Sequence, residues 1–400
     1  MGQRNIEKVS IMGWALAIVC FISNISQLPI IVDRGLSSLI AMATWGLFAV
    51  FCICYGIKWK ILKSIIPILI MALIYGVFIC LMEIFSANSY LSSSLIYPIF
   101  LSIFILFIAT NIGHLVSSKD LENIATAYIW GALVVCVNVY FEYLVNANIA
   151  DRVYAYDSKN SVAQILFTAF LLIFLFKFSR KKLLAKILYL AIALFLLVSI
   201  LLLKSRATII AIPCSAVFAL LLGSKKDKYF RWKMLFLLVG IVLYLVFFPQ
   251  IYQTLINDIL LGGRDNGNLN DVTSGRWGEW ENFFADLGNG WLLGNGRMKR
   301  ESLILTAILE YGFPIGTMII ALAVMPLIYA LKNIKNRDKI VETLFYVAAA
   351  YFLNAIFEQL APFGPGVKCY FLWLIFGIAL AKKNEIGQKG ALDYKQGRGY

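Results

Sequence analysis

Apolar segments long enough to cross a lipid bilayer recur along the whole chain, and they constrain its fold more than any other feature. A helix needs about twenty apolar residues to span the hydrocarbon core. Windows of that length identify candidate spans at residues 9–30, 36–57, 62–85, 91–112, 122–145, 160–178, 183–203, 205–223, 232–249, 303–331, 341–361 and 366–381. In lipid each backbone amide must find its partner inside the segment, so the spans must be helices. The sequence predicts an all-α polytopic integral membrane protein with about twelve transmembrane helices.

The chain divides into two membrane segments separated by a polar insert. With 61% hydrophobic and only 14% charged residues, it carries more apolar surface than a soluble core could use. Spans one to nine are expected in residues 1–249, a large loop in residues 250–302, and spans ten to twelve in residues 303–382. Residues 383–400 are polar and contain several glycines, which predicts a disordered cytoplasmic tail.

Basic residues indicate how the chain is oriented in the membrane. Lysines and arginines follow spans two, six, eight and ten, at Lys58, Lys60, Lys63, Arg180, Lys181, Lys182, Lys186, Lys225, Lys226, Lys228, Arg231, Lys332, Lys335, Arg337 and Lys339. Because cytoplasmic loops are enriched in these residues, both termini are predicted in the cytoplasm and the large loop outside. The same loops account for the net charge of +14 through topology and contact with anionic lipids. No basic stripe coincides with a soluble domain, which argues against nucleic acid as a partner.

Neither a metal site nor a cofactor is predicted. The seven cysteines lie within or at the edges of predicted spans, where a thiol behaves as a small apolar group. Cys52 and Cys54 are too close together and too isolated to indicate a metal site or a disulfide framework. The glycines between residues 288 and 296 follow no strand and match no nucleotide-binding fingerprint, so they predict a flexible turn.

Cations on the predicted outer side are candidates for binding an anionic ligand. One set lies before span six and includes Arg152 and Asn160, and a second is the short hairpin with Lys204 and Arg206. Snorkelling to lipid headgroups is the plain alternative for such cations. An outer hairpin with two cations and no acid opposes the usual charge bias, however, so an anionic ligand is the preferred interpretation.

The large loop supplies the third set of polar groups. Trp277, Trp280, Phe284 and Leu287 recur at a spacing of three and four residues, which predicts an amphipathic helix on the outer surface. The alternative is that this helix is only an anchor or a lid. Arg276 would lie in its first turn, where the helix dipole favours an anion that the guanidinium could hold.

Two carboxylates flank the start of the tenth span, shortly after Arg297. Glu301 and Glu310 are separated by about two and a half helical turns, so both could face one cavity. Carboxylates in such positions are more often partners of arginine than catalysts.

The order of these motifs resembles that of the O-antigen polymerase and O-antigen ligase superfamily of bacterial inner-membrane glycosyltransferases. The resemblance covers most of the chain. It rests on a Lys-Asn-Ser helix start at residues 159–161, a Ser-Arg-Ala-Thr hairpin at 205–208, a Ser-Gly-Arg stretch with tryptophans at 274–280, and a Leu-Gly-Asn-Gly turn at 293–296. Each motif is short, and their order on matching sides of the membrane carries the likeness.

The resemblance implies an enzyme that transfers a glycan from undecaprenyl pyrophosphate to a sugar hydroxyl on the periplasmic face, without metal or nucleotide. It places Arg206 and Arg276 at the leaving pyrophosphate, since guanidinium groups match phosphate oxygens. Glu301 or Glu310 would be the base. Lys204, Arg152, Asn160, Arg297, Trp277 and Trp280 would contact donor or glycan. A chain-length regulator is the implied protein partner.

One departure from the family pattern separates two activities. Ligases carry a histidine where this chain has Glu301 and Ser302, and the sole histidine, His114, lies in a predicted cytoplasmic loop. This favours a polymerase, which joins lipid-linked repeat units with inversion, over a ligase that transfers glycan to lipid A-core. A flippase for the lipid-linked unit is a third hypothesis. It would need polar groups along a path through the bilayer, and the mid-span positions are almost all apolar.

Overall fold

Every regular element is helical in the part of the chain that the computed structural model describes. The described residues are 9–55, 63–86, 89–141, 159–177, 183–203, 205–222, 253, 270, 275–296, 298, 300–334, 338–364 and 369–396. Among them, eight helices are long and apolar enough to cross a membrane. The structure therefore confirms an all-α, polytopic class for these residues.

The helices follow the apolar windows closely. Each window coincides with a helix except 232–249, which lies outside the described residues. In chain order the elements are α1 (Ile11–Ile25), α2 (Pro29–Val32), α3 (Ser37–Cys54), η1 (Lys63–Ile65), α5 (Ile66–Phe85), α6 (Ile96–Ile112), η2 (Gly113–Leu115), α7 (Ser118–Val139), α9 (Lys159–Phe176), α10 (Leu183–Leu202), α11 (Arg206–Leu222), α15 (Arg276–Glu281), α16 (Phe283–Leu287), α17 (Leu303–Asn333), α18 (Lys339–Phe357) and α19 (Tyr370–Gln396).

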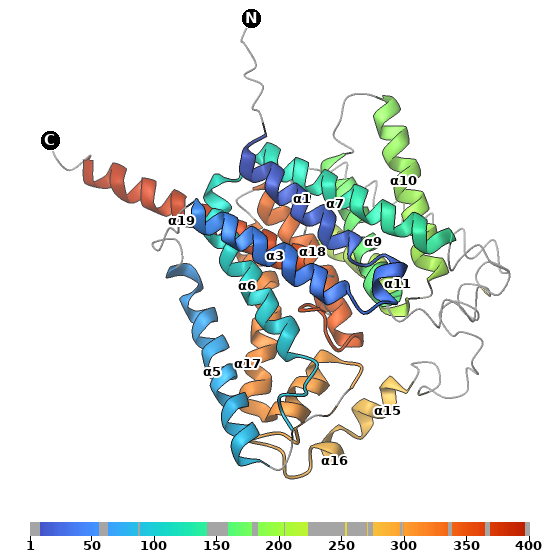
Figure 1. Ribbon diagram of the computed structural model, residues 1–400, viewed down its shortest axis with the longest axis vertical. Coiled ribbons are helices and arrows are strands. Elements are labelled where there is room, and N and C mark those ends of the chain that lie inside the picture. The colour runs from blue at the N-terminus through green and yellow to red at the C-terminus, as the bar shows by residue number, and fades with distance from the viewer. Residues whose placement is uncertain are drawn as a thin grey trace, which may run out of the picture.

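The first half of α19 occupies the centre of the bundle. Residues 370–381 are all buried, and α19 packs along α6, while α1 packs along α7 and α17 along α18 (Figure 1). By contrast, α5 and α10 expose large aliphatic and aromatic side chains, including Phe85 and Leu184 at 80% and 81%. Contiguous exposed apolar faces of this kind suit contact with lipid.

A single buried carboxylate joins the starts of α1 and α7. Asp120 accepts hydrogen bonds from the backbone N–H of Ser10 at 2.7 Å and of Ser117 at 2.8 Å. Ser117 in turn accepts from the Asp120 N–H, completing a capping box. A Cβ at Gly13 would overlap the Asp120 carboxylate, so glycine is required for this close approach. These caps fix the end of the bundle that is remote from α15 and α16 (Figure 1).

Helix α17 is interrupted one third of the way along its length. Gly312 has φ 74° and ψ 174°, so the helix consists of two segments that meet at a kink. Pro314, two residues further on, lacks the amide hydrogen that a continuous helix would use. The break leaves backbone carbonyls of the first segment available to other partners, and it lies beside the candidate site.

Two details differ from the sequence-based expectations. The amphipathic helix in the large loop is two short helices, α15 and α16, because Asn282 leaves helical geometry at φ −86° and ψ 0°. The helix α19 continues to Gln396, through residues for which a disordered tail was expected. Alanine, lysine, glutamate and glutamine in this stretch favour helix, and they offset its glycines.

Candidate functional site

The glycine-containing turn at residues 291–296 folds back onto the break in α17. The N–H groups of Asn295 and Gly296 donate to the carbonyls of Leu309 and Glu310 at 2.8 and 3.2 Å. The N–H of Phe313 donates to the carbonyl of Trp291 at 2.8 Å. The backbone groups released by the kink are thereby satisfied within the protein, as they must be near a bilayer.

Two glycines make this backbone contact possible. Gly294 and Gly312 have φ angles of 76° and 74°, in the left-handed region that L side chains rarely adopt. A Cβ on Gly294 would overlap the backbone of Glu310, and one on Gly312 would overlap that of Leu292. The sequence predicts a flexible turn here, whereas the structure has a turn locked against the helix.

Glu310 is enclosed at the centre of this contact. Its side chain is 1% exposed. One carboxylate oxygen, Oε2, accepts from the hydroxyl of Ser93 at 2.5 Å, and Oε1 accepts from the N–H of Met298 at 3.2 Å. Ser93 lies in the loop between α5 and α6, so the carboxylate connects three segments of the chain.

Tyrosines line the same region. The Tyr90 hydroxyl donates to the backbone carbonyl of Leu293 at 3.1 Å, and the Tyr75 hydroxyl donates to the Tyr311 hydroxyl at 2.9 Å. Burial raises the pKa of Tyr90 above its ordinary value. The backbone N–H of Tyr90 donates to Glu83 at 2.7 Å, which orders the loop that carries Ser93.

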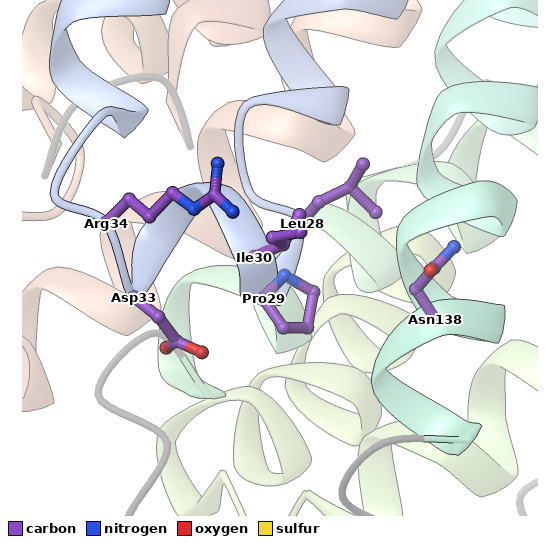
Figure 2. A pocket seen from close by; sticks show the side chains of 6 residues that line it. All are labelled: Leu28, Pro29, Ile30, Asp33, Arg34 and Asn138. Atoms are coloured by element: carbon purple, nitrogen blue, oxygen red, sulfur yellow. The ribbon is translucent and has the colours of Figure 1, made fainter.

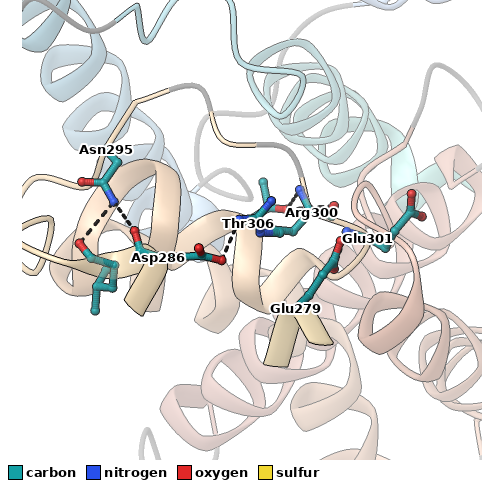
Figure 3. Close-up of polar contacts among 7 residues, drawn as sticks. Glu279, Asp286, Asn295, Arg300, Glu301 and Thr306 are labelled. Atoms are coloured by element: carbon teal, nitrogen blue, oxygen red, sulfur yellow. Dashed lines mark hydrogen bonds and ion pairs between the residues drawn. The ribbon is translucent and has the colours of Figure 1, made fainter. Parts of the chain in front are cut away.

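A second group of contacts ties α16 to the start of α17 (Figure 3). The Arg300 guanidinium donates to the Asp286 carboxylate at 2.6 Å. The Asn295 amide donates to the carbonyl of Asp286 at 2.8 Å, and Thr306 donates to the carbonyl of Arg300 at 3.1 Å. The loop is therefore a folded unit with fixed polar contacts.

Arg276 and Glu301 form an open ion pair at the edge of this unit. The guanidinium lies 3.4 Å from the Glu301 carboxylate, with side chains 20% and 50% exposed. The Nε atom of Arg276 is buried and has no hydrogen-bond acceptor among the described residues. The hydroxyl of Ser302, next to Glu301, is also buried without a partner there. Buried polar groups are rarely left without partners, so both atoms are candidates for contact with a ligand.

Glu279 supports the Glu301 backbone. It accepts the N–H of Glu301 at 3.0 Å (Figure 3). Burial, followed by the charge of Glu301, raises the pKa of the Glu279 carboxyl above its ordinary value. Glu279 and Glu301 are therefore two neighbouring acids, joined through the Glu301 backbone amide.

Exposed aromatic side chains lie on the same loop. Trp277 and Trp280 are 44% and 41% exposed, and Phe284 is 68% exposed, whereas Leu287 is buried against α17. The Trp277 indole N–H donates to Glu281 at 2.5 Å. Trp291 stacks on Phe313 with ring centroids 5.1 Å apart. This exposed aromatic surface suits either lipid headgroups or sugar rings.

The structure brings some of the predicted residues together and separates others. Arg276, Glu301, Trp277 and Trp280 lie in one cluster. Glu301 is exposed while Glu310 is enclosed, so the two carboxylates have different surroundings rather than facing one open cavity.

The remaining predicted residues are placed less completely. Asn160 is half-buried in the first turn of α9. Arg206 is the first residue of α11, but its side chain lies outside the described part. Lys204, Arg152 and Arg297 also lie outside the described residues.

Sequence reasoning missed the contribution of the loop between α5 and α6. The Ser93 hydroxyl donates a hydrogen bond to Glu310, and the Ser94 hydroxyl accepts one from the Gln359 amide at 2.8 Å. The three consecutive serines at residues 92–94, on the same predicted side as the large loop, were the signal that could have found it. Asp286, Arg300 and Glu279 were also missed as a supporting set, because their pairing depends on the tertiary fold.

A separate cavity lies near the ends of α2 and α7. It has a volume of about 360 Å³ and is lined by Leu28, Pro29, Ile30, Asp33, Arg34 and Asn138 (Figure 2). None of the predicted site residues contributes to it. Among the described residues, no group of three or more His, Cys, Asp or Glu side chains is arranged to hold a metal ion.

Comparison with known proteins adds no assignment. No protein-family model matches the chain, and no curated protein matches it. What the structure defines is a class: in its described part the protein is all-helical, with eight helices long and apolar enough to cross a membrane and a folded polar loop containing an arginine–glutamate pair.

Proposed function

We propose that this protein is an O-antigen polymerase of a bacterial inner membrane. It would transfer a glycan from undecaprenyl pyrophosphate to a sugar hydroxyl of another lipid-linked repeat unit. The observation that carries the proposal is the Arg276 guanidinium, which keeps a buried N–H donor without an acceptor among the described residues while contacting Glu301. The guanidinium can donate hydrogen bonds to a diphosphate, and the carboxylate can accept one from a sugar hydroxyl.

The chemistry follows from these two side chains. The acceptor hydroxyl oxygen bonds to the anomeric carbon as the bond between that carbon and the diphosphate oxygen breaks, which inverts the configuration. The hydroxyl proton passes to Glu301, and the electron pair leaves with the undecaprenyl diphosphate. Arg276, together with Arg206, would stabilise the negative charge that develops on the leaving group.

The contact between Arg276 and Glu301 gives the site a simple order of events. Without a ligand, the Arg276 guanidinium pairs with the Glu301 carboxylate at a distance of 3.4 Å. A diphosphate with two negative charges competes for the same guanidinium, because bidentate phosphate pairing is strong. Binding of the donor would then release Glu301 to accept the proton from the acceptor hydroxyl.

Topology and partners are part of the same proposal. We place about twelve spans in the inner membrane, both termini in the cytoplasm, and the loop with α15 and α16 in the periplasm. The interior of the bilayer supplies the lipid-linked donor and acceptor, Trp277 and Trp280 contact sugar or headgroups, and a chain-length regulator is a protein partner. No metal or other cofactor takes part.

A ligase is the second candidate, and the position of His114 weighs against it. His114 follows α6 at the end opposite to Ser93, and the intervening 17-residue helix is about 25 Å long. A ligase that depends on a histidine would therefore find none at the Arg276 and Glu301 pair.

Lipopolysaccharide from a strain lacking the gene tests the proposal. Loss of a polymerase leaves lipopolysaccharide with a single O-antigen repeat unit. Loss of a ligase leaves lipopolysaccharide with no O-antigen at all. Restoration of long chains by the wild-type gene, but not by Arg276→Ala at equal protein level, is the expected result. Unchanged chain length in the deletion strain would reject both enzyme assignments.

A further inference from the structure

The enclosed Glu310 carboxylate connects three parts of the site that are distant in sequence. Its own helix segment ends at the Gly312 kink, Ser93 comes from the loop between α5 and α6, and Met298 comes from the segment that leads to Glu301. We infer that Glu310 is a positioning residue, which holds the segment at residues 294–301 so that Glu301 meets Arg276. The inference rests on the proposed function, since it assigns different roles to its two candidate carboxylates.

The geometry leaves Glu310 poorly suited to act as a base. Both carboxylate oxygens already accept hydrogen bonds, one from Ser93 and one from Met298, and the side chain is 1% exposed. A general base must reach the proton that it abstracts, directly or through one water. Glu301 is 50% exposed beside Arg276, and therefore it can reach a substrate hydroxyl.

Hydrogen bonds to the segment at residues 294–301 show how Glu310 influences the position of Glu301. The segment is attached to the first part of α17 by the N–H groups of Asn295, Gly296 and Met298. Two of these bonds go to backbone carbonyls, and the third goes to the Glu310 side chain. Glu301 follows Met298 by three residues. Thr306 and Asp286 also hold Arg300, and Glu279 accepts the Glu301 N–H. Removal of the Met298 bond therefore loosens the chain that leads to Arg300 while these other contacts remain.

The chemistry of glutamine separates the two roles. The new amide in Glu310→Gln has one carbonyl oxygen, which can accept from the Met298 N–H, and an NH₂ group, which can donate to the Ser93 hydroxyl. Both attachments thus survive in this variant, although the side chain can no longer accept a proton. Alanine removes both attachments.

The test combines turnover with amide hydrogen exchange on the full-length protein in detergent. Turnover is the lengthening of lipid-linked glycan, and exchange is followed in peptides that cover residues 294–301. We expect Glu310→Gln to keep turnover within about threefold of wild type and to keep exchange protection. Glu310→Ala should lose at least about tenfold in both, because a hydrogen bond to a charged group is removed.

Variants in the neighbouring loop keep the test decisive if Glu310→Ala does not fold. Ser93→Ala removes one attachment and should raise exchange in residues 294–301, with partial loss of turnover. Ser94→Ala is the matched control, because Ser94 lies beside Ser93 in the same loop and accepts its hydrogen bond from Gln359. It should leave both readouts unchanged.

Each outcome has one meaning. Loss of turnover in Glu310→Gln with protection retained would make Glu310 the base and overturn the inference. Unchanged exchange in Glu310→Ala and Ser93→Ala would also overturn it. If the wild-type protein does not lengthen glycan, the proposed function fails, whereas the exchange results still decide whether Glu310 anchors the segment.

Discussion

At the scale of single residues, Arg276 is the side chain on which the proposed mechanism depends most. It occupies the first position of α15, contacts Glu301, and retains a buried Nε donor without an acceptor among the described residues. The sequence predicted Arg276 in the first turn of a helix in the large loop, and the structure agrees. Its pairing with Glu301 could not be predicted, because the two residues are 25 positions apart and the fold of the chain between them decides whether they meet.

We expect Arg276→Ala to reduce glycan lengthening by at least about a hundredfold, the usual cost of removing one donor to developing negative charge. Arg276→Lys should also lose most activity, since an ammonium cannot reproduce the planar fork. The measurement is the initial rate with purified protein. Arg34→Ala, at an exposed arginine in the separate cavity, is the control and should keep the wild-type rate. An active Arg276→Ala protein would remove the residue from the mechanism.

Glu279 predicts a pH effect on stability. Its pKa is raised above the ordinary value of 4.5 by burial and then by the charge of Glu301. The folded state therefore holds the Glu279 proton more tightly than the unfolded state, and this stabilisation is complete below pH 4.5. It is lost as the pH rises through the raised pKa.

The variant Glu279→Gln should make the melting temperature less dependent on pH. Glutamine can still accept the Glu301 N–H but carries no charge that burial penalises. Melting curves in detergent from about pH 4 to about pH 8 measure the effect. We expect the melting temperature of the variant to rise relative to that of wild type as the pH increases. A relative rise only at acidic pH would contradict the raised pKa of Glu279.

At the scale of elements, the interlocked turn and kinked helix determine the shape of the site. Gly294 and Gly312 approach opposite backbones with positive φ angles, and Glu310 is enclosed beside them. Helix positions were predictable from the apolar windows, because hydrophobicity sets where a span lies. The break at Asn282 and the kink at Gly312 were not, because both depend on partners elsewhere in the chain.

Glycine substitutions separate backbone strain from close packing. Gly35 has φ 68°, and no described atom lies within 4 Å of where a Cβ would stand. Gly35→Ala therefore carries only the conformational cost of about 1–2 kcal/mol. Gly294→Ala has the same backbone cost plus overlap with the Glu310 backbone. We expect a much larger fall in melting temperature for Gly294→Ala. Equal effects would show that the turn and α17 are not in contact.

At the scale of the whole molecule, the helix caps formed by Asp120 and the polar site lie at opposite ends of the bundle. The Asp120 caps lie at one end, and the turn at residues 291–296 lies at the other with α15 and α16 (Figure 1). The charge pattern predicts that the second end faces the periplasm. Composition was sufficient to predict the class of protein, whereas the contact between the loop before α6 and the start of α17 required the tertiary structure.

Cysteine labelling tests this orientation. In a variant without native cysteines, we expect a cysteine at Phe284 to react with an impermeant maleimide added to intact spheroplasts. A cysteine at Lys332, in the last turn of the 31-residue helix α17, should react only after the membrane is opened. The reverse pattern would invert the proposed topology and place the Arg276 and Glu301 pair in the cytoplasm.

The most direct test of the proposed reaction uses purified protein, a lipid-linked repeat unit and a chelator in detergent. We predict that wild-type protein converts the substrate into a ladder of longer lipid-linked glycans and releases undecaprenyl diphosphate, with no membrane to cross. Glu301→Gln protein should give no ladder. Unchanged substrate with folded wild-type protein, or an equal ladder with Glu301→Gln, would contradict the claim.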